Sequence, residues 1–354
     1  MIGIDEGLAR IVRLDPQTVA LGAAAVVCMA LALLSFVFAP SLTLYLVATL
    51  VAVLAYGWYV HQEGAAKVTL FLTTVSTVII IALITVYLLA TAIPAFRHVG
   101  VDILLRTEQP LWGTTGDVYS LAPMMWGTLI VTAIAMVIAG PLGVAGAIFI
   151  SEIAPSWARE IVKPAVETLA GIPSIVYGFL AFVVLNSYMM KEFSLPTYGS
   201  LFVTGTVVGV MALPTVVSVA EDALSSVPDP MRDGALALGV TDWQTTKSVT
   251  LPAAFSGVSA AVLLGVGRAV GETMAATVIL ANVTRFPEPL ADVFGNTITL
   301  TSLIASQHGA AHGNPLQMSA LFAAGVVLFV TVMVLSVGSQ LIEAHMRSRL
   351  GGET

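Results

Sequence analysis

The sequence predicts an all-α polytopic membrane protein with about eight transmembrane helices. Of its 354 residues, 57% are hydrophobic and only 10% are charged, whereas about 25% of the residues of a soluble domain are charged. Residues 16–60 contain no Asp, Glu, Lys or Arg. A helix needs about 20 mainly apolar residues to cross a bilayer, and the chain has several such segments. The sequence therefore predicts that its helices face lipid.

Eight segments are long and apolar enough to span the membrane. By residue number they are 18–39, 41–60, 68–94, 120–150, 168–190, 199–220, 254–281 and 317–342. Pro40 separates the first two, and Pro141 is expected to kink or divide the fourth. The segment 297–313 is rich in Ser, Thr and His. It fits a helix at the outer surface, or a re-entrant helix, better than a ninth span.

Eight spans place both termini on the same side of the membrane. If that side is the cytoplasm, nine Lys and Arg residues lie inside, four lie outside and Arg268 lies in the membrane, which accounts for all 14. Cytoplasmic loops carry an excess of Lys and Arg. The sequence therefore predicts a multi-pass protein of the cell membrane, in contact with lipid and with both termini cytoplasmic.

The composition argues against several classes of function. Cys28 is the one cysteine, which excludes a disulfide within the chain and a thiolate metal cluster. The formal charge of −7 argues against nucleic-acid binding. The sequence has no G-x-x-x-x-G-K-[ST] phosphate loop, so we expect that the chain does not bind ATP in the usual way, and we expect no other cofactor.

Metal binding and catalysis are also not expected. His308 and His312 lie one helical turn apart and could ligate a metal ion. A glycine follows each histidine and no cysteine is near, so we expect a solvated surface helix instead. No cluster of acids and no nucleophile with supporting groups marks a membrane face. An enzyme is therefore the least expected class.

The loop between the sixth and seventh spans carries signals for two short helices. Asp229 followed by Pro230 is an N-cap with proline in the first helical position, and Gly239 suits the end of that helix. Thr241 and Gln244 have the spacing of a capping box. The helices would present Ala235, Leu236, Leu238 and Trp243. These signals alone leave two alternatives equally open: docking to a partner, or lying among the lipid headgroups.

Two opposite charges, Arg268 and Glu272, lie in the middle of the seventh span. Their i, i+4 spacing puts them on one helix face, where they can pair. A lone charge at mid-bilayer costs roughly 2.5–3.5 kcal/mol on insertion scales, so this face is expected to point into the bundle or a water-filled cavity. Gly267 and Gly271 form a G-x-x-x-G pattern that lets another helix approach closely.

The pair has a structural and a functional interpretation. It could be an ion pair that locks two helices together. Intramembrane ionisable groups usually mark a substrate or ion path, and this favours function. Arginine suits an oxyanion because its planar donor fork matches the oxygens. Glu272 would then hold the Arg268 guanidinium while the path is empty, and would limit affinity so that the anion can leave.

Several stretches resemble one family of transport proteins. "GRAVGETMA" at 267–275 is similar to the signature of the PstC-type permease of phosphate-specific ABC importers, a type I ABC permease. The stretches 141–155, 167–185 and 294–298 resemble the same family, and the likeness covers about residues 68–346. In 167–185, "GIPSIVYG" is expected to be a kink with packing glycines rather than a substrate contact.

The loop of the two short helices resembles the coupling loop of ABC importer permeases. The resemblance consists of Asp233, Gly234 and Ala235, then Gly239, and finally Leu251 with Pro252. Asp233 stands where the family has Glu, and Gly234 where it has Ala. The resemblance implies that this loop, about 225–253, seats on an ATPase subunit. It also implies a six-helix permease domain at 67–354, preceded by an extra transmembrane hairpin at 1–66.

The resemblance implies a transmembrane permease subunit of an ATP-driven phosphate importer, in which Arg268 and Glu272 take part in phosphate passage. The implied partners are a second, PstA-like permease, a PstB-like ATPase dimer that hydrolyses ATP, and a PstS-like phosphate-binding protein. The predicted outer loops carry six acids against four bases, a balance that would not attract phosphate from bulk water. The alternatives are an ABC permease for another oxyanion, such as molybdate or sulfate, and a self-contained ion-coupled transporter or channel.

Overall fold

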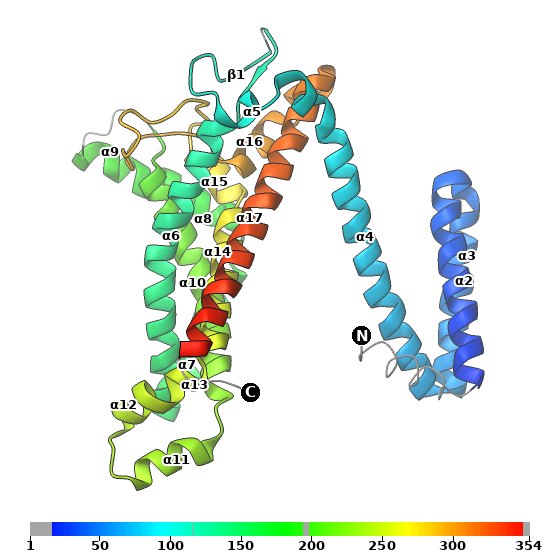
Figure 1. Ribbon diagram of the computed structural model, residues 1–354, viewed down its shortest axis with the longest axis vertical. Coiled ribbons are helices and arrows are strands. Elements are labelled where there is room, and N and C mark those ends of the chain that lie inside the picture. Colours follow the sequence, from blue (N-terminus) through cyan, green and yellow to red (C-terminus); the bar gives the residue numbers. More distant parts are fainter. Residues whose placement is uncertain (1–15, 115, 194–197, 350–354) are drawn as a thin grey trace. The chain divides into compact units, whose positions relative to one another are not determined.

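The computed structural model describes residues 16–114, 116–193 and 198–349. The chain divides into two compact units, Met1–Tyr87 and Leu88–Thr354, so the division falls within one long helix, α4 (Gln62–Val99). In the second unit, β1 and α5 lie at one end and α11 and α12 at the other (Figure 1). We call these the strand end and the loop end.

The first unit is a helical hairpin followed by the beginning of α4. It contains α2 (Pro16–Phe38) and α3 (Pro40–Val60). As predicted, Pro40 starts the second helix. The two helices pack closely at Gly57, where an added Cβ would lie 2.6 Å from the Leu21 side chain. Small residues allow such close approach between helices in lipid.

The second unit is built around three long helices, α6, α10 and α14. In chain order its elements up to the loop end are α5 (Asp102–Leu105), β1 (Trp112–Gly113), β2 (Val118–Tyr119), α6 (Ala122–Ile148), the π-helix η1 (Phe149–Ile153), α7 (Ser156–Gly171), α8 (Ser174–Leu180), the π-helix η2 (Ala181–Asn186), α9 (Ser187–Phe193) and α10 (Leu201–Ser225). The remaining elements are α11 (Asp229–Ala237), α12 (Asp242–Thr245), the π-helix η3 (Thr246–Thr250), α13 (Leu251–Ala253), α14 (Phe255–Gly271), α15 (Met274–Ile279), α16 (Leu300–Gln307), the 3-10 helix η4 (Ala310–Gly313) and α17 (Pro315–Arg349). β1 and β2 pair antiparallel, with Trp112 opposite Tyr119.

Glycines let the central helices of this unit touch. An added Cβ at Gly209 of α10 would lie 2.9 Å from the Ala135 carbonyl oxygen of α6. At Gly143 of α6 and at Gly265 of α14 it would meet Val216 of α10, at 2.7 and 2.6 Å. The three helices therefore form the closely packed centre of the unit.

The number of predicted spans is confirmed, although two spans are interrupted. In the described part of the chain, seven helices are long and apolar enough to cross a membrane, or eight if the pair Asp242–Ala253 and Phe255–Gly271, bent by 72°, counts as one span. The predicted span 168–190 begins instead at Ser174, because Pro173 separates α8 from α7. The predicted span 254–281 is broken after Gly271. Pro141 does not divide the fourth span, since α6 continues through it.

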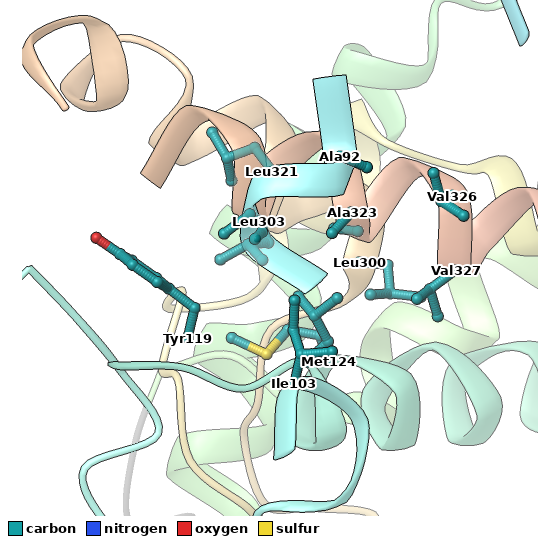
Figure 2. Packing of buried hydrophobic residues seen from close by; sticks show 14 of the residues in the cluster. Ala92, Ile103, Tyr119, Met124, Leu300, Leu303, Leu321, Ala323, Val326 and Val327 are labelled. Carbon is teal, nitrogen blue, oxygen red and sulfur yellow. The ribbon is translucent and has the colours of Figure 1, made fainter. Parts of the chain in front are cut away.

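A buried hydrophobic cluster fixes the strand end of the unit. Figure 2 shows Ile103 and Met124 packed close to Leu300 and Leu303 of α16 and to α17. The first four residues of α16, Leu300 to Leu303, are all buried. With eight residues, α16 is about 12 Å long at 1.5 Å per residue, too short to span. The segment 297–313 thus contains a short, partly buried helix rather than one lying on the surface.

Candidate translocation site and coupling loop

The seventh predicted span breaks at Glu272. Helix α14 ends at Gly271, Glu272 has an extended backbone (φ −65°, ψ 121°), and α15 begins at Met274. The Glu272 carboxylate accepts a hydrogen bond from the Ala275 backbone N–H at 3.0 Å. Its backbone carbonyl accepts another from the Thr301 hydroxyl of α16 at 2.8 Å. Both contacts satisfy polar groups at the break, so Glu272 stabilises an interrupted helix.

Arg268 lies in the last turn of α14 and is exposed in the isolated chain. Its Nε donates a hydrogen bond to the Met211 carbonyl oxygen of α10 at 3.0 Å. Nη1 and Nη2 form no hydrogen bond or ion pair with any residue that the structure describes. These terminal nitrogens carry four of the five N–H donors of a guanidinium, and these donors are free to bind a ligand.

The expected pairing of Arg268 with Glu272 is therefore wrong. None of the ion pairs in the described ranges joins the two side chains. The i, i+4 rule holds only for a continuous helix, and the helix ends between these residues. The close approach expected at Gly267 and Gly271 is also not seen within this chain, since a Cβ added at either would meet nothing within 4 Å.

The kink at Pro173 brings α8 against the break. The Tyr177 hydroxyl donates to the Leu169 carbonyl oxygen of α7 at 3.1 Å. A Cβ at Gly178 would lie 2.8 Å from Ala275 Cα in α15. The structure agrees with the interpretation of this segment as a kink with a packing glycine.

One face of the second half of α14 is open. Leu264, Arg268 and Gly271 are spaced i, i+4 and i+7 and are all exposed. An arginine facing hydrocarbon is costly, and such residues face a bundle interior or a water-filled cavity. This face therefore requires water or another protein chain opposite it. The arrangement can bind an anion at an open helix face beside a broken span.

The loop end contains the two predicted short helices. Gly239, with φ +84°, joins them in the left-handed region that favours glycine. The capping box of Thr241 and Gln244 is confirmed. The first helix begins one residue earlier than expected: Pro228 occupies the N-cap position, and Asp229 is the first helical residue. Leu238 is 86% exposed and Trp243 is 58% exposed.

The other residues predicted for the coupling loop lie on both sides of this turn. Asp233 and Gly234 are exposed on α11, and Ala235 is partly buried. Leu251 and Pro252 form α13, where the chain bends by 72° into α14. These residues were predicted from the resemblance to a coupling loop, and the two short helices from helix signals. The observed loop presents the apolar side chains of Leu238 and Trp243 to its surroundings.

Sequence reasoning missed a set of paired charges at the loop end. Lys163 of α7 donates to the Glu221 carboxylate of α10 at 2.6 Å, and this hydrogen bond raises the pKa of the Lys163 ammonium. Arg232 of α11 lies 3.2 Å from the Glu152 carboxylate of η1. These residues lie just beyond the apolar segments. Their sequence signal was a cluster of charges at span ends, which does not indicate how they pair.

The fold matches that of solved membrane transporters. The crystal structure of a bacterial alginate ABC transporter in complex with alginate pentasaccharide-bound periplasmic protein contains a chain that matches with a TM-score of 0.54 at 16% identity, over 83% of this chain and 98% of that one. The interrupted helical bundle is therefore the fold of an ABC transporter chain.

The chain belongs to the family of binding-protein-dependent transport system inner membrane components, whose model matches residues 139–348. It is 38% identical to the probable ABC transporter permease protein YqgH of Bacillus subtilis, over 70% of this chain and 80% of the relative. It is 32% identical to the phosphate transport system permease protein PstC of Haemophilus influenzae, over 82% of this chain and 95% of the relative. The predicted family and fold class are confirmed. A permease of this family works with a separate ATPase and a separate binding protein.

Proposed function

We propose that this chain is the permease subunit of an ATP-driven phosphate importer and forms half of its translocation path. The observation that carries the proposal is the open Arg268 guanidinium, anchored through Nε to Met211 and with both terminal nitrogens unoccupied. The planar, positively charged guanidinium group can donate two parallel hydrogen bonds to the oxygens of phosphate. Relatives at 31–33% identity that are named as phosphate transport permeases support this choice of anion.

The site would bind phosphate weakly enough to release it. Arg268 supplies one fixed positive charge, and the Met211 carbonyl restricts its movement. Glu272 lies one turn further on, at the break, where its negative charge opposes tight binding of an anion. Discontinuous membrane helices commonly form transporter substrate sites, and transport then proceeds by switching the bundle around the site.

The loop end would receive the movement that ATP hydrolysis drives. Asp233, Gly234 and Ala235, with Gly239, Leu251 and Pro252, would form the coupling loop that seats on the ATPase. The exposed Leu238 and Trp243 side chains support docking, because exposed apolar groups at a protein surface mark contacts with partners. In this arrangement the loop end and both termini face the cytoplasm.

The remaining partners follow from the same proposal. A PstA-like second permease would lie against the open face of α14, a PstB-like ATPase dimer against the coupling loop, and a PstS-like phosphate-binding protein at the strand end. Residues 67–354 would be the permease domain, with 1–66 as an additional hairpin.

Uptake by the reconstituted complex tests the proposal. The permease is assembled in liposomes with its second permease, ATPase and binding protein, and ATP-dependent entry of labelled phosphate is measured with sulfate or molybdate as competitors. We expect phosphate uptake that excess sulfate and molybdate do not suppress. Preferred uptake of another oxyanion would contradict the proposed substrate, and uptake by this chain without an ATPase would contradict the proposed class.

A further inference from the structure

The first helix of the coupling loop, α11, is attached to the bundle by polar contacts. It has no buried residue, and its apolar side chains Met231 and Leu236 are exposed. Arg232 Nη2 donates to the Leu224 carbonyl oxygen at 2.7 Å and lies 3.2 Å from Glu152 Oε1. Within the ranges that the structure describes, no other α11 side chain hydrogen-bonds to or pairs with the bundle. Besides the backbone and the packing of α11 on η3, the Arg232 side chain is therefore the polar link from α11 to the bundle.

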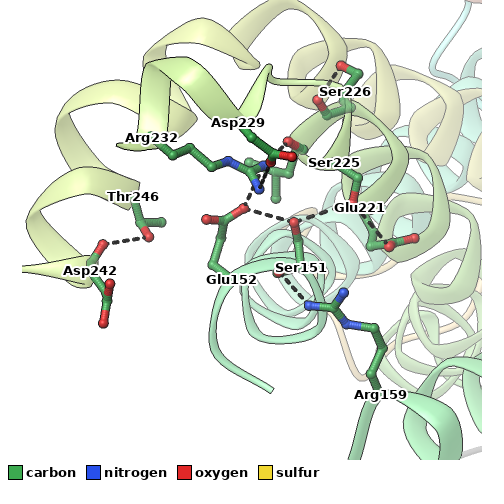
Figure 3. Close-up of polar contacts among 12 residues, drawn as sticks. Ser151, Glu152, Arg159, Glu221, Ser225, Ser226, Asp229, Arg232, Asp242 and Thr246 are labelled. Carbon is green, nitrogen blue, oxygen red and sulfur yellow. Dashed lines mark hydrogen bonds and ion pairs between the residues drawn. The ribbon is translucent and has the colours of Figure 1, made fainter. Parts of the chain in front are cut away.

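Arg232 contacts two helix ends at once, and Figure 3 shows its contact with Glu152. Leu224 lies in the last turn of α10, where carbonyl oxygens lack partners within the helix and a cation is favourable. Glu152 lies in η1, the π-helix that ends α6. π-Bulges are frequent at functional sites. The guanidinium thus joins α11 to the ends of two of the three central helices, α6 and α10.

Glu152 is firmly held on the bundle side. Its side chain is only 9% exposed, and the Ser151 hydroxyl donates to the same Oε1 at 2.9 Å. Arg159 of α7 donates to the Ser151 carbonyl oxygen at 2.7 Å. A buried carboxylate is unfavourable without a partner, so the Arg232 contact is strongly favoured over a free Glu152.

The same helix, α10, reaches the candidate anion site. Met211, whose carbonyl holds Arg268, lies 13 residues before Leu224, which is about 20 Å along a helix. Resting on the proposed function, we infer that the Arg232–Glu152 ion pair is the link by which the coupling loop moves α6 and α10, and with α10 the Arg268 site. Arg232 and Glu152 are positioning residues and do not contact the anion.

The test measures how many ATP molecules the assembled complex hydrolyses per phosphate imported into liposomes. Arg232→Met removes the link but keeps an unbranched side chain suited to a helix. Coupling between sites typically amounts to factors of about 5 to 150, and we expect the ATP-to-phosphate ratio to rise about tenfold. Arg232→Lys, which keeps the charge, should recover most of the coupling.

A matched control separates transmission from general stability. Lys163→Met removes another cation bound to a buried carboxylate at the loop end, at 2.6 Å from Glu221, but not one on α11. It should leave the ratio unchanged. The inference is overturned if Arg232→Met keeps the unmodified ratio, or if Lys163→Met raises it equally.

If Arg232→Met does not assemble, a double variant keeps the test decisive. Arg232→Met with Glu152→Gln leaves no unpaired buried charge, so it should assemble and remain uncoupled; normal coupling would contradict the inference. The unmodified complex tests the proposed function separately. If it imports another oxyanion, phosphate is the wrong substrate, and the ratio is measured with that anion instead.

Discussion

Charged side chains make different contacts in two regions of this permease. At the loop end, Lys163 pairs with Glu221 and Arg232 with Glu152, at 2.6 and 3.2 Å. Beside the broken span, Arg268 contacts a backbone carbonyl through Nε and pairs with no carboxylate in the described part of the chain. Paired charges hold helix ends together, whereas a cation with unoccupied donors can bind a passing anion.

The burial of the charged side chains also differs between the two regions. The Glu221 and Glu152 side chains are 7% and 9% exposed, while Arg268 is exposed in the isolated chain. A buried carboxylate without its partner is costly, so the loop-end pairs persist through movement. Arg268 has no such constraint, and its donors are available to whatever lies opposite the α14 face.

Removing the Arg268 charge should have the largest effect. Arg268→Ala deletes the donors, and we expect phosphate uptake to fall roughly 100-fold, the effect of losing one donor to an oxyanion in enzymes. Uptake is measured in liposomes after the assembly of the complex has been verified. Arg285→Ala, which removes an exposed arginine from the segment after α15, is the control and should keep uptake. Unchanged uptake in Arg268→Ala would reduce this arginine to a structural role.

Gly178→Ala would disturb the packing that supports the break. The added Cβ would lie 2.8 Å from Ala275 Cα, and overpacking of this kind costs about 1–3 kcal/mol. We expect a lower unfolding temperature in detergent and reduced uptake. Gly171→Ala, whose added Cβ meets nothing within 4 Å, should change neither. Equal unfolding temperatures for the two variants would argue against close packing of α8 on α15.

Glu272→Gln separates the role of the carboxylate charge from its hydrogen bond. Glutamine can still accept from the Ala275 N–H, so the break is kept, but a hydrogen bond to a charged group is weakened. Such bonds contribute about 1.5–3 kcal/mol, and we expect uptake to fall roughly tenfold. The apparent affinity for phosphate should rise, because a nearby negative charge is lost. A loss of uptake as large as that of Arg268→Ala would mean that both charges contribute equally.

Gly239→Val at the loop end should uncouple ATP hydrolysis from transport without weakening phosphate binding. A β-branched residue is disfavoured at φ +84°, so the substitution would alter the angle between α11 and α12. We expect the number of ATP molecules hydrolysed per phosphate imported to rise about fivefold, which is the low end of typical coupling factors. Gly171→Ala, outside the coupling loop and with nothing within 4 Å of the added Cβ, is the control and should couple normally. Normal coupling in Gly239→Val would count against docking through this turn.

Much of the fold could be predicted from apolar segment length, and the number and order of spans followed from it. The capping box at Thr241 and the turn at Gly239 followed from local backbone chemistry. The break at Glu272 could not be predicted, because no proline marks it and its backbone groups are satisfied by distant residues such as Thr301. The Arg268 contact with Met211 and the Arg232 contact with Glu152 likewise join residues far apart in the sequence, and pairing of this kind has no local signal.

Access of water to residue 268 decides whether an anion path passes beside Arg268. With Cys28→Ala as background, Arg268→Cys is treated with a membrane-impermeant thiol reagent added to either side of the vesicle. The treatment is done once with the ATPase trapped in one state and once with the ATPase left free. Labelling is expected from one side of the membrane in each state of the ATPase. Absence of labelling from both sides in every state would contradict an anion path beside this residue.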